Sequence, residues 1–165
     1  MPLYKNVISR FLLCGVADMT SQYIEDKTLH TSRTLSFATY GGVSAPILFY
    51  SFRFLSPRFS PLQASFIQEA IIWPVTCLPI YFLMYNISSS PSYTPNHILE
   101  KTKEDLITKG PKTIIYSAGL WIPIGYAQYK YCPPWSQTYV RTVLATIYYI
   151  GLSYITHDSH IKESS

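Results

Sequence analysis

Hydrophobic and polar positions alternate along this chain on the scale of whole segments. Five long runs of mostly apolar residues are separated by short stretches rich in proline, serine and charged residues. Each run is close to the ~20 residues that a helix needs to cross ~30 Å of hydrocarbon. The pattern therefore predicts hydrophobic helices that lie in a membrane. The predicted segments are residues 7–24, 34–55, 62–87, 113–131 and 136–156.

The last two segments have the strongest membrane character. Residues 113–156 contain two charged side chains, Lys130 and Arg141. Pro133 and Pro134 remove two backbone donors and prevent a continuous helix, so two hydrophobic helices should meet there at a sharp bend. Whether residues 113–131 span completely or form a bent half-helix stays open. The expected fold is an all-α polytopic membrane bundle of four transmembrane helices, with a possible fifth, bent segment.

One further helix, over residues 95–109, is predicted to be amphipathic. Thr94 and Pro95 form a helix start, and Gly110 followed by Pro111 forms a stop. Lysines and acids occupy one face, so this helix should lie at the membrane surface or against a partner. Its apolar face is expected to contain Ile98, Leu99, Thr102 and Leu106.

Composition agrees with a single integral membrane domain over residues 1–165. Hydrophobic residues make up 48% and charged residues 13%, about half the usual charged share. The mean hydropathy is only +0.11, but fifteen tyrosines lower it although their rings suit helix packing and interfaces. An aromatic-rich soluble helical domain is the alternative. The net charge of +4 is too scattered to form a nucleic-acid-binding stripe, so no nucleic-acid partner is expected.

Polar residues inside the hydrophobic segments must be hidden from lipid. An ionised side chain at the bilayer centre costs roughly 2.5–3.5 kcal/mol on insertion scales. In the first segment a polar or small residue recurs every fourth position from Arg10 to Gln22, which keeps these residues on one third of the helix surface. In the third, Glu69 needs a cationic partner, for which Arg10, Arg53 and Arg141 are candidates. The expected pore-lining or ion-pairing residues are Asp18, Gln22, Arg53, Gln68, Glu69, Gln128 and Arg141.

The second segment contains two overlapping patterns of small residues. Ala38-x-x-x-Gly42 and Gly41-x-x-x-Ala45 place small side chains one helical turn apart, which lets another helix approach closely in lipid. Pro46 is expected to kink this helix. Pro74 and Pro79 are expected to bend the third segment, which membrane helices tolerate when neighbours satisfy the freed carbonyls.

Patterns typical of enzymes are missing from the sequence. It has no phosphate-binding glycine loop and no nucleophile elbow, so no enzyme activity, catalytic residue or cofactor is expected beyond bound lipid. The three cysteines lie far apart and read as small buried residues without a disulfide. His157 and His160 lack further ligands, so a solvated tail is favoured over a metal site. Asn86-Ile87-Ser88 matches a glycosylation sequon, which is expected to be a chance match.

Several residues fall on a family motif that runs Trp-Pro, Gln, Asn-Phe, Val-Pro, Arg, Trp and Tyr-Leu-Ser. Trp121, Pro133, Tyr148 and the run from Gly151 through Leu152 to Ser153 fit this frame without a gap. The chain departs from the motif where proline moves to Pro123, the glutamine position is Gly125, Asn-Phe becomes Gln128-Tyr129, and Gln137 takes the arginine position. Other matching residues are Asp18, Gln22, Arg33, Gly41, Gly42, Pro46 and Leu55.

On these residues the chain resembles the family of peroxisomal membrane protein 22 and its mitochondrial inner-membrane relative, Mpv-seventeen, as a divergent member. The resemblance implies a non-enzymatic membrane protein with a channel-like or membrane-homeostasis role, in a family that passes small solutes and is tied to mitochondrial DNA maintenance. The alternative is a structural accessory subunit of a large mitochondrial membrane complex, such as the respiratory chain or ATP synthase, that has lost transport.

Location and partners follow from the same two hypotheses. Lys5 and Arg10 precede the first acid, Asp18, and this basic start favours the mitochondrial inner membrane over the peroxisomal membrane. The expected partners are membrane lipids and other membrane subunits or further copies of the chain. The charges of the loops do not decide on which side the termini lie.

Overall fold

The structure is a computed structural model that describes residues 2–25, 28–89 and 94–148. These residues are almost entirely helical, and no strand occurs in the described part of the chain, which confirms the all-α prediction. Predictions for Leu152, Ser153, the end of the last hydrophobic segment and the histidine tail fall outside the described residues.

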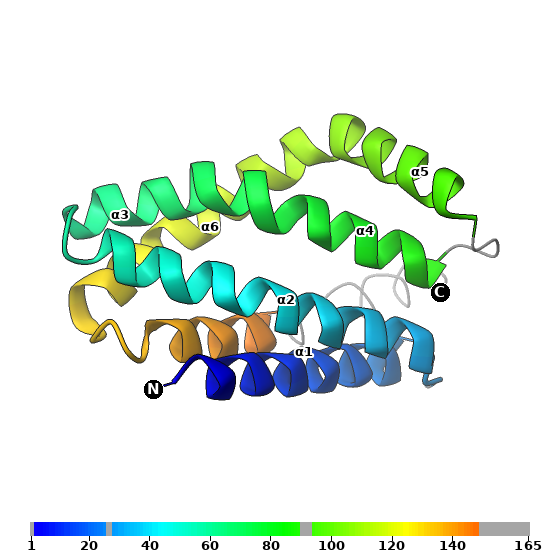
Figure 1. Cartoon of the computed structure of the whole chain (residues 1–165), viewed down its shortest axis with the longest axis horizontal. Helices are drawn as coiled ribbons and strands as arrows, with labels where there is room; N and C mark the ends of the chain where they lie inside the picture. Colours follow the sequence, from blue (N-terminus) through cyan, green and yellow to red (C-terminus); the bar gives the residue numbers. More distant parts are fainter. Residues whose placement is uncertain (1, 26–27, 90–93, 149–165) are drawn as a thin grey trace, which may run out of the picture.

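The helices run back and forth along the longest axis of the molecule (Figure 1). α1 is followed by the antiparallel α2, and α3, η1 and α4 together form one continuous rod that runs back again (Figure 1). α5 lies at the end of this rod, α6 returns, and a further helical stretch covers residues 137–148. Their bounds are α1 Leu3–Glu25, α2 Thr31–Leu55, α3 Pro61–Ile67, η1 Gln68–Cys77, α4 Leu78–Ser89, α5 Pro95–Thr108 and α6 Gly110–Tyr131.

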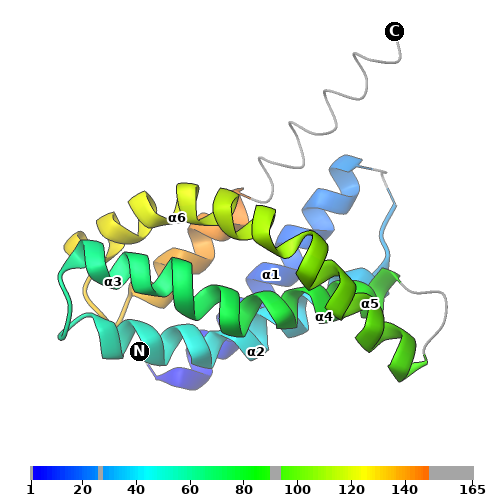
Figure 2. The same ribbon diagram turned by 90° about the horizontal axis from the view of Figure 1, so that it is seen from above.

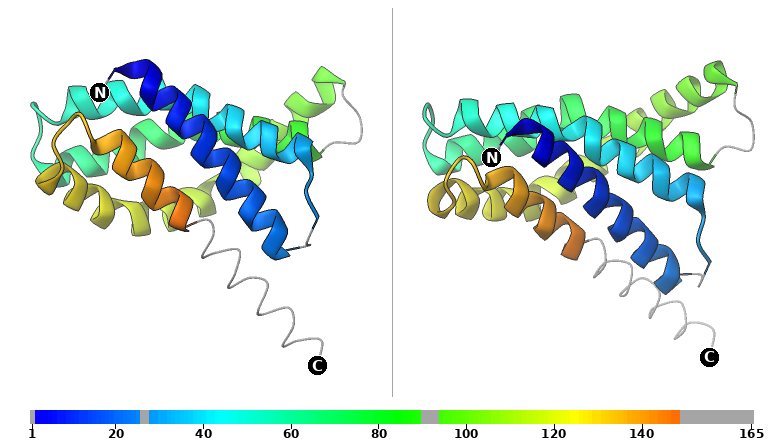
Figure 3. Two further views of the ribbon diagram at one scale, coloured as in Figure 1. Left: turned by 90° about the horizontal axis from the view of Figure 1, so that it is seen from below. Right: turned by 60° about the horizontal axis from the view of Figure 1, so that its bottom comes forward.

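Two neighbours flank the rod, and a second pair of helices lies beneath. Seen from above, the rod runs between α2 and α6 (Figure 2), and it packs against both. Residues 137–148 run beside α1 (Figure 3), and a hydrogen bond from Arg10 to Thr142 joins the two. Residues 137–148 thus lie beneath the rod and reach it through a contact of Arg141 with Glu69.

The fourth segment forms one continuous helix, α6, with Pro123 inside it. α6 has 22 residues, enough at ~1.5 Å per residue to cover ~30 Å. It ends at Tyr131, and helix resumes at residue 137, so the bend expected at Pro133 and Pro134 is present. Ser136 closes the turn by donating its backbone N–H to the Pro133 carbonyl (2.9 Å).

Prolines change the hydrogen bonding of the rod without interrupting it. Pro74 lies within η1, a ten-residue π-helix, and Pro79 follows immediately where α-helix resumes. Proline has no N–H to donate, and a wider helical register accommodates the gap in the ladder. Thr76 Oγ1 adds a hydrogen bond to the Ile72 carbonyl (2.6 Å). π-Helical turns are frequent at functional sites, and this one begins with the polar pair Gln68 and Glu69.

Small residues bring α1 and α2 into close contact, as their spacing predicts. A methyl group on Gly41 would lie 2.6 Å from both the Arg10 carbonyl oxygen and Cys14 Sγ. At Gly15, by contrast, the nearest atom would be the Ala38 methyl at 3.5 Å, an ordinary contact. Gly41 is therefore the point at which the two backbones approach most tightly among these contacts.

Many polar side chains lie inside the bundle beside a hydrophobic core that includes Leu48 and Phe52, and many large apolar side chains lie on its surface. The buried described residues include more polar or charged side chains than hydrophobic ones. α1 shows the pattern most clearly, since its buried face holds Asn6, Arg10, Asp18 and Gln22. Its exposed hydrophobic residues are Tyr4, Ile8, Phe11, Leu12, Val16, Met19 and Tyr23.

One described stretch, Pro61–Ser88, is long and apolar enough to cross a membrane by length and composition. It coincides with the rod and with the third predicted segment. The other described helices do not reach that threshold, so the four-span arrangement stays a prediction.

Candidate functional site

A buried ion pair occupies the centre of the bundle. Arg141 Nη2, on helical residues 137–148, donates to Glu69 Oε2 on the rod at 2.6 Å, and the two side chains are 7% and 1% exposed. The Arg141 guanidinium also lies over the Trp121 ring of α6, 3.9 Å from its centroid. Of the three arginines that the sequence offered as partners for Glu69, the structure selects Arg141.

Two buried amide side chains leave part of their hydrogen-bonding capacity unused. Gln68, which precedes Glu69 in the rod, is fully buried, and neither its Oε1 nor its Nε2 has a partner among the described residues. Gln128 Nε2 makes one long bond to the Gln137 carbonyl (3.4 Å), whereas its Oε1 has none. Glu69 Oε1 and Arg141 Nη1 are likewise unpartnered. Buried polar groups are rarely left unpaired, so this cluster is unusual.

Arg10 forms a second buried cationic position. Its Nη1 donates to Thr142 Oγ1 (3.3 Å) and its Nη2 to Ser44 Oγ (3.2 Å), whereas Nε has no partner. The sequence offered Arg10 as a partner for Glu69, but its contacts are hydroxyl groups from α2 and residues 137–148. No described carboxylate pairs with it.

A separate cluster of polar side chains lies at the end of the bundle where α1 connects to α2. Asp18 accepts from Arg33 Nε (3.0 Å) through Oδ1 and from Thr34 Oγ1 (3.1 Å) through Oδ2. Gln22 donates to Asp18 and to Thr34, and accepts from the His30 backbone N–H. Asp18 and Gln22 thus lie on the buried polar stripe that their spacing predicts, and the motif residue Arg33 supplies the counter-charge.

Arg53 lies on the outer surface of the described bundle and not in its interior, and its role as a pore-lining or ion-pairing residue stays a prediction. Its side chain is exposed on α2 and lies over the Phe49 ring, 5.0 Å from the centroid. Residues 49 and 53 are one helical turn apart, so a local contact holds the guanidinium on the surface. Sequence position alone did not reveal which face of α2 turns outward.

The motif residues lie at several places in the bundle. Trp121 contacts both Arg141 and Tyr148, whose ring centroid lies 5.8 Å away in an edge-to-face arrangement. Gly41 lies at the α1–α2 contact, Pro46 within α2 and Pro133 in the bend after α6. The resemblance to the family therefore includes residues of the buried centre as well as residues that shape the helices.

A polar contact between α4 and α5 was missed by the sequence analysis. Asn86, the sequon residue, is fully buried and donates to Asp105 Oδ2 (3.0 Å) and Thr102 Oγ1 (3.3 Å). The buried face of α5 is formed by Ile98, Thr102 and Asp105, while Leu99 is exposed. The predicted apolar face is thus rotated, because the hydrogen bonds of Asp105 and Thr102 to Asn86 turn this side of α5 inward. Asn6 and Gln137 are further buried amides that the sequence analysis did not select.

The contact between α4 and α5 predicts acid-sensitive stability. Lys109, at 2.6 Å, and to a lesser extent Asn86 hold the pKa of Asp105 below its ordinary value, although burial acts against them. A carboxyl group whose pKa is lower in the folded than in the unfolded protein contributes stability above the unfolded value of ~3.9. That contribution is lost as the pH falls through the folded pKa. In thermal unfolding, the difference in midpoint between the wild type and Asp105→Asn should therefore be constant from pH 7 to about 5 and shrink below about 4.

The matched control is Glu104→Gln, which neutralises an exposed acid on the same helix. It should keep the acid-dependent loss of stability that the wild type shows. If Asp105→Asn instead ran parallel to the wild type at every pH, Asp105 would not hold α5 in place.

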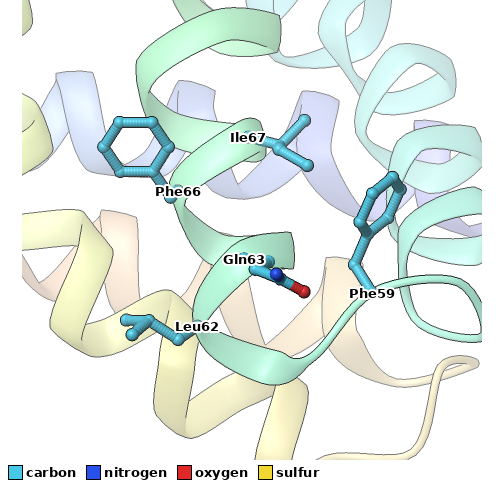
Figure 4. A pocket seen from close by; sticks show the side chains of 5 residues that line it. All are labelled: Phe59, Leu62, Gln63, Phe66 and Ile67. Atoms are coloured by element: carbon cyan, nitrogen blue, oxygen red, sulfur yellow. The ribbon is translucent and has the colours of Figure 1, made fainter.

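An apolar depression lies on the outside of the bundle, near the α2–α3 turn (Figure 4). It has a volume of about 410 Å³ and is remote from the buried ion pair. Its lining residues are Phe59, Leu62, Gln63, Phe66 and Ile67. With an almost wholly apolar wall, it offers no chemistry to a polar ligand.

The chemistry of the centre is that of charge binding and hydrogen bonding. The described interior contains two guanidinium groups, of which one is paired with Glu69, and several buried amides. Among the described residues, no group of three His, Cys, Asp or Glu side chains could hold a metal ion.

Comparisons of this chain with known protein families, proteins and structures found no match. No family model matches the chain, no curated protein is similar to it, and no solved structure matches its fold. The resemblance to the family of peroxisomal membrane protein 22 therefore stays a prediction that depends on the motif residues.

Proposed function

We propose that this chain is a non-enzymatic integral membrane protein of the peroxisomal membrane protein 22 and Mpv-seventeen type. Its helices span the bilayer, and its polar centre provides a closed path for small polar solutes. The proposed location is the mitochondrial inner membrane, with the peroxisomal membrane as the alternative. The observation that carries the proposal is the distribution of side chains, with polar groups buried and large apolar groups exposed.

A lipid environment is compatible with both the exposed apolar side chains and the buried polar ones. A large apolar side chain is stabilised by about 1.5–3 kcal/mol when it leaves water, and α1 alone exposes several of them. An ion such as Arg10 or Asp18 would be costly in hydrocarbon, but both face the protein interior. Average hydropathy along α1 is low because it includes this hidden face. Partition into a bilayer depends on the exposed face.

The centre supports a solute path because three segments contribute polar groups to it. Gln68 and Glu69 come from the rod, Gln128 from α6 and Arg141 from residues 137–148. Unpartnered amide atoms at these positions can replace part of the hydration shell of a small solute. The Glu69–Arg141 contact closes the path, and conduction requires these two side chains to separate.

Purified protein in planar bilayers tests this function. The wild type should conduct, and Gln68→Leu should reduce the conductance at least several-fold. The fold should survive because Gln68 makes no hydrogen bond that leucine would break, and apolar replacement of a buried unpaired group is close to neutral. Arg53→Gln, on the outer surface, is the matched control and should conduct like the wild type. A wild-type protein that inserts but never conducts would contradict the proposal.

The second candidate is an accessory subunit of a large mitochondrial membrane complex. It is favoured by the closed centre, where Glu69, Arg141 and Trp121 are in direct contact. A subunit that no longer transports would need such contacts only for stability. Native electrophoresis distinguishes the two, since a subunit should migrate only at the mass of the complex.

A further inference from the structure

One of the two buried arginines of the described bundle lacks a carboxylate partner. Arg10 and Arg141 are 5% and 6% exposed, and Glu69 is the carboxylate paired with Arg141. The other two buried carboxylates, Asp18 and Asp105, pair with the more exposed Arg33 and Lys109. Among the described residues, the positive charge of Arg10 therefore has no counter-ion. A guanidinium stays protonated in proteins, so the charge is not removed by loss of a proton.

The hydroxyl groups around Arg10 do not neutralise it. Ser44 donates its own proton to the Gly41 carbonyl (3.2 Å), and Thr142 donates to the Thr138 carbonyl (2.8 Å). Both hydroxyl oxygens therefore act as acceptors towards Arg10, which orients the guanidinium without supplying a negative charge. A buried charge without a counter-ion is costly, which makes a bound anion favourable at this position.

Unused donors accompany this unpaired charge. Arg10 Nε, Asn6 Nδ2 and Arg141 Nη1 have no partner among the described residues, and each residue is at least nine-tenths buried. Asn6 precedes Arg10 by one turn of α1, so the two side chains lie on the same face. Arg10 also donates to Thr142 Oγ1 (3.3 Å), the residue that follows Arg141 in the sequence. Positive charge and free N–H groups are the features that recognise an anion.

We infer that the interior between α1, α2 and residues 137–148 binds a small monovalent anion, with Arg10 as the principal binding residue. The ligand class is a halide or a carboxylate of formate size. The tight α1–α2 contact at Gly41, one turn from Ser44, leaves no room for a large one. This inference deepens the proposed function, since it gives the solute path a preference for anions. It also has a test that does not require conduction.

Thermal unfolding of the detergent-solubilised full chain provides that test. Potassium chloride or potassium formate should replace potassium gluconate at constant ionic strength, so that the cation and the ionic strength are unchanged and only the anion differs. A ligand that binds only the folded state raises its stability, so the wild-type midpoint should rise on the order of 5 °C at saturating chloride. A shift with chloride alone indicates a halide site, and a shift with both salts indicates a site for small anions in general. Identical midpoints in all three salts would overturn the inference.

Substitutions locate the site. Arg10→Gln should lose the dependence on the anion, whereas Arg53→Gln, which removes an exposed guanidinium, should keep it. Should Arg10→Gln fail to fold, Arg10→Lys retains the charge and should keep the dependence at a shifted anion concentration. Anion dependence that persists in a folded Arg10→Gln protein, or that is absent from a folded Arg10→Lys protein, would contradict the role of Arg10.

A conductance measurement distinguishes a failure of the anion site from a failure of the proposed channel function. Under a gradient of potassium chloride the reversal potential should lie towards the chloride equilibrium potential in the wild type, and move towards zero in Arg10→Gln. A conducting wild type without anion preference and without anion-dependent stability overturns the inference and leaves the proposed function intact. A wild type that is stabilised by chloride but does not conduct supports the anion site and contradicts the proposed function.

Discussion

Glu69→Gln should destabilise the bundle more than any other single neutralisation of a buried charge. Removing one member of a buried ion pair typically costs about 3–5 kcal/mol, because the other charge is left without compensation. Here the change leaves two buried guanidinium groups, Arg10 and Arg141, and neither can become neutral. Thermal or denaturant unfolding in detergent should show this loss in the free energy of unfolding.

The opposite change, Arg141→Gln, should cost less than Glu69→Gln. It leaves Glu69, which can take up a proton and become neutral inside the bundle. The double variant should recover much of the loss of Glu69→Gln, since the two amides can hydrogen-bond to each other. Substitutions at two contacting residues are not additive, so the double variant should lose less stability than the sum of the single variants. Arg53→Gln is the control and should stay within about 0.5 kcal/mol of the wild type. Equal and additive losses for the two single variants would contradict a direct pair between Glu69 and Arg141.

Gly41→Ala should give the second large effect, through packing alone. The added methyl group would meet the Arg10 carbonyl oxygen and Cys14 Sγ, both at 2.6 Å. Forcing extra volume into a packed interior costs about 1–3 kcal/mol, even though alanine is the better helix former by about 1 kcal/mol. We therefore expect a net loss of stability with separation of α1 from α2, measured by unfolding in detergent.

A matched control lies in α6. A methyl group on Gly119 would meet no atom within 4 Å, so Gly119→Ala should be neutral or stabilising by up to about 1 kcal/mol. Cys14→Ala would relieve only part of the strain in Gly41→Ala, because the contact with the Arg10 backbone carbonyl remains. A Gly41→Ala protein as stable as Gly119→Ala would show that α1 and α2 are not held at this distance.

Helix positions could be predicted because their signals are local. Pro133 and Pro134 interrupt the helix whatever the surrounding tertiary packing is, because they remove backbone donors. The four-residue spacing from Arg10 to Gln22 likewise fixes a polar face on α1, since helix geometry sets which residues share a side. The ten-residue π-helix was not predicted from sequence. Pro74 indicated a bend, but the register that accommodates it depends on the packing of neighbouring helices.

Partners across the bundle could not be predicted in the same way. Glu69 had three candidate arginines, and only the rotation of the helices about their axes placed Arg141 against it and Arg53 on the surface. Asn86 matched a sequon, but its contact with Asp105 arises from the position of α5 at the end of the rod. Such contacts join residues far apart in sequence, so no local pattern records them.

By itself, then, the sequence determined that this protein is helical, which stretches form its helices to within a few residues, and which residues within them are polar. Periodicity and proline positions carry that information because backbone geometry is a local property. The tertiary structure alone decided which charges pair, that Arg10 has only hydroxyl partners among the described residues, and which apolar side chains face outward. These depend on the relative rotation and depth of the helices, which are set by the packing of the whole bundle.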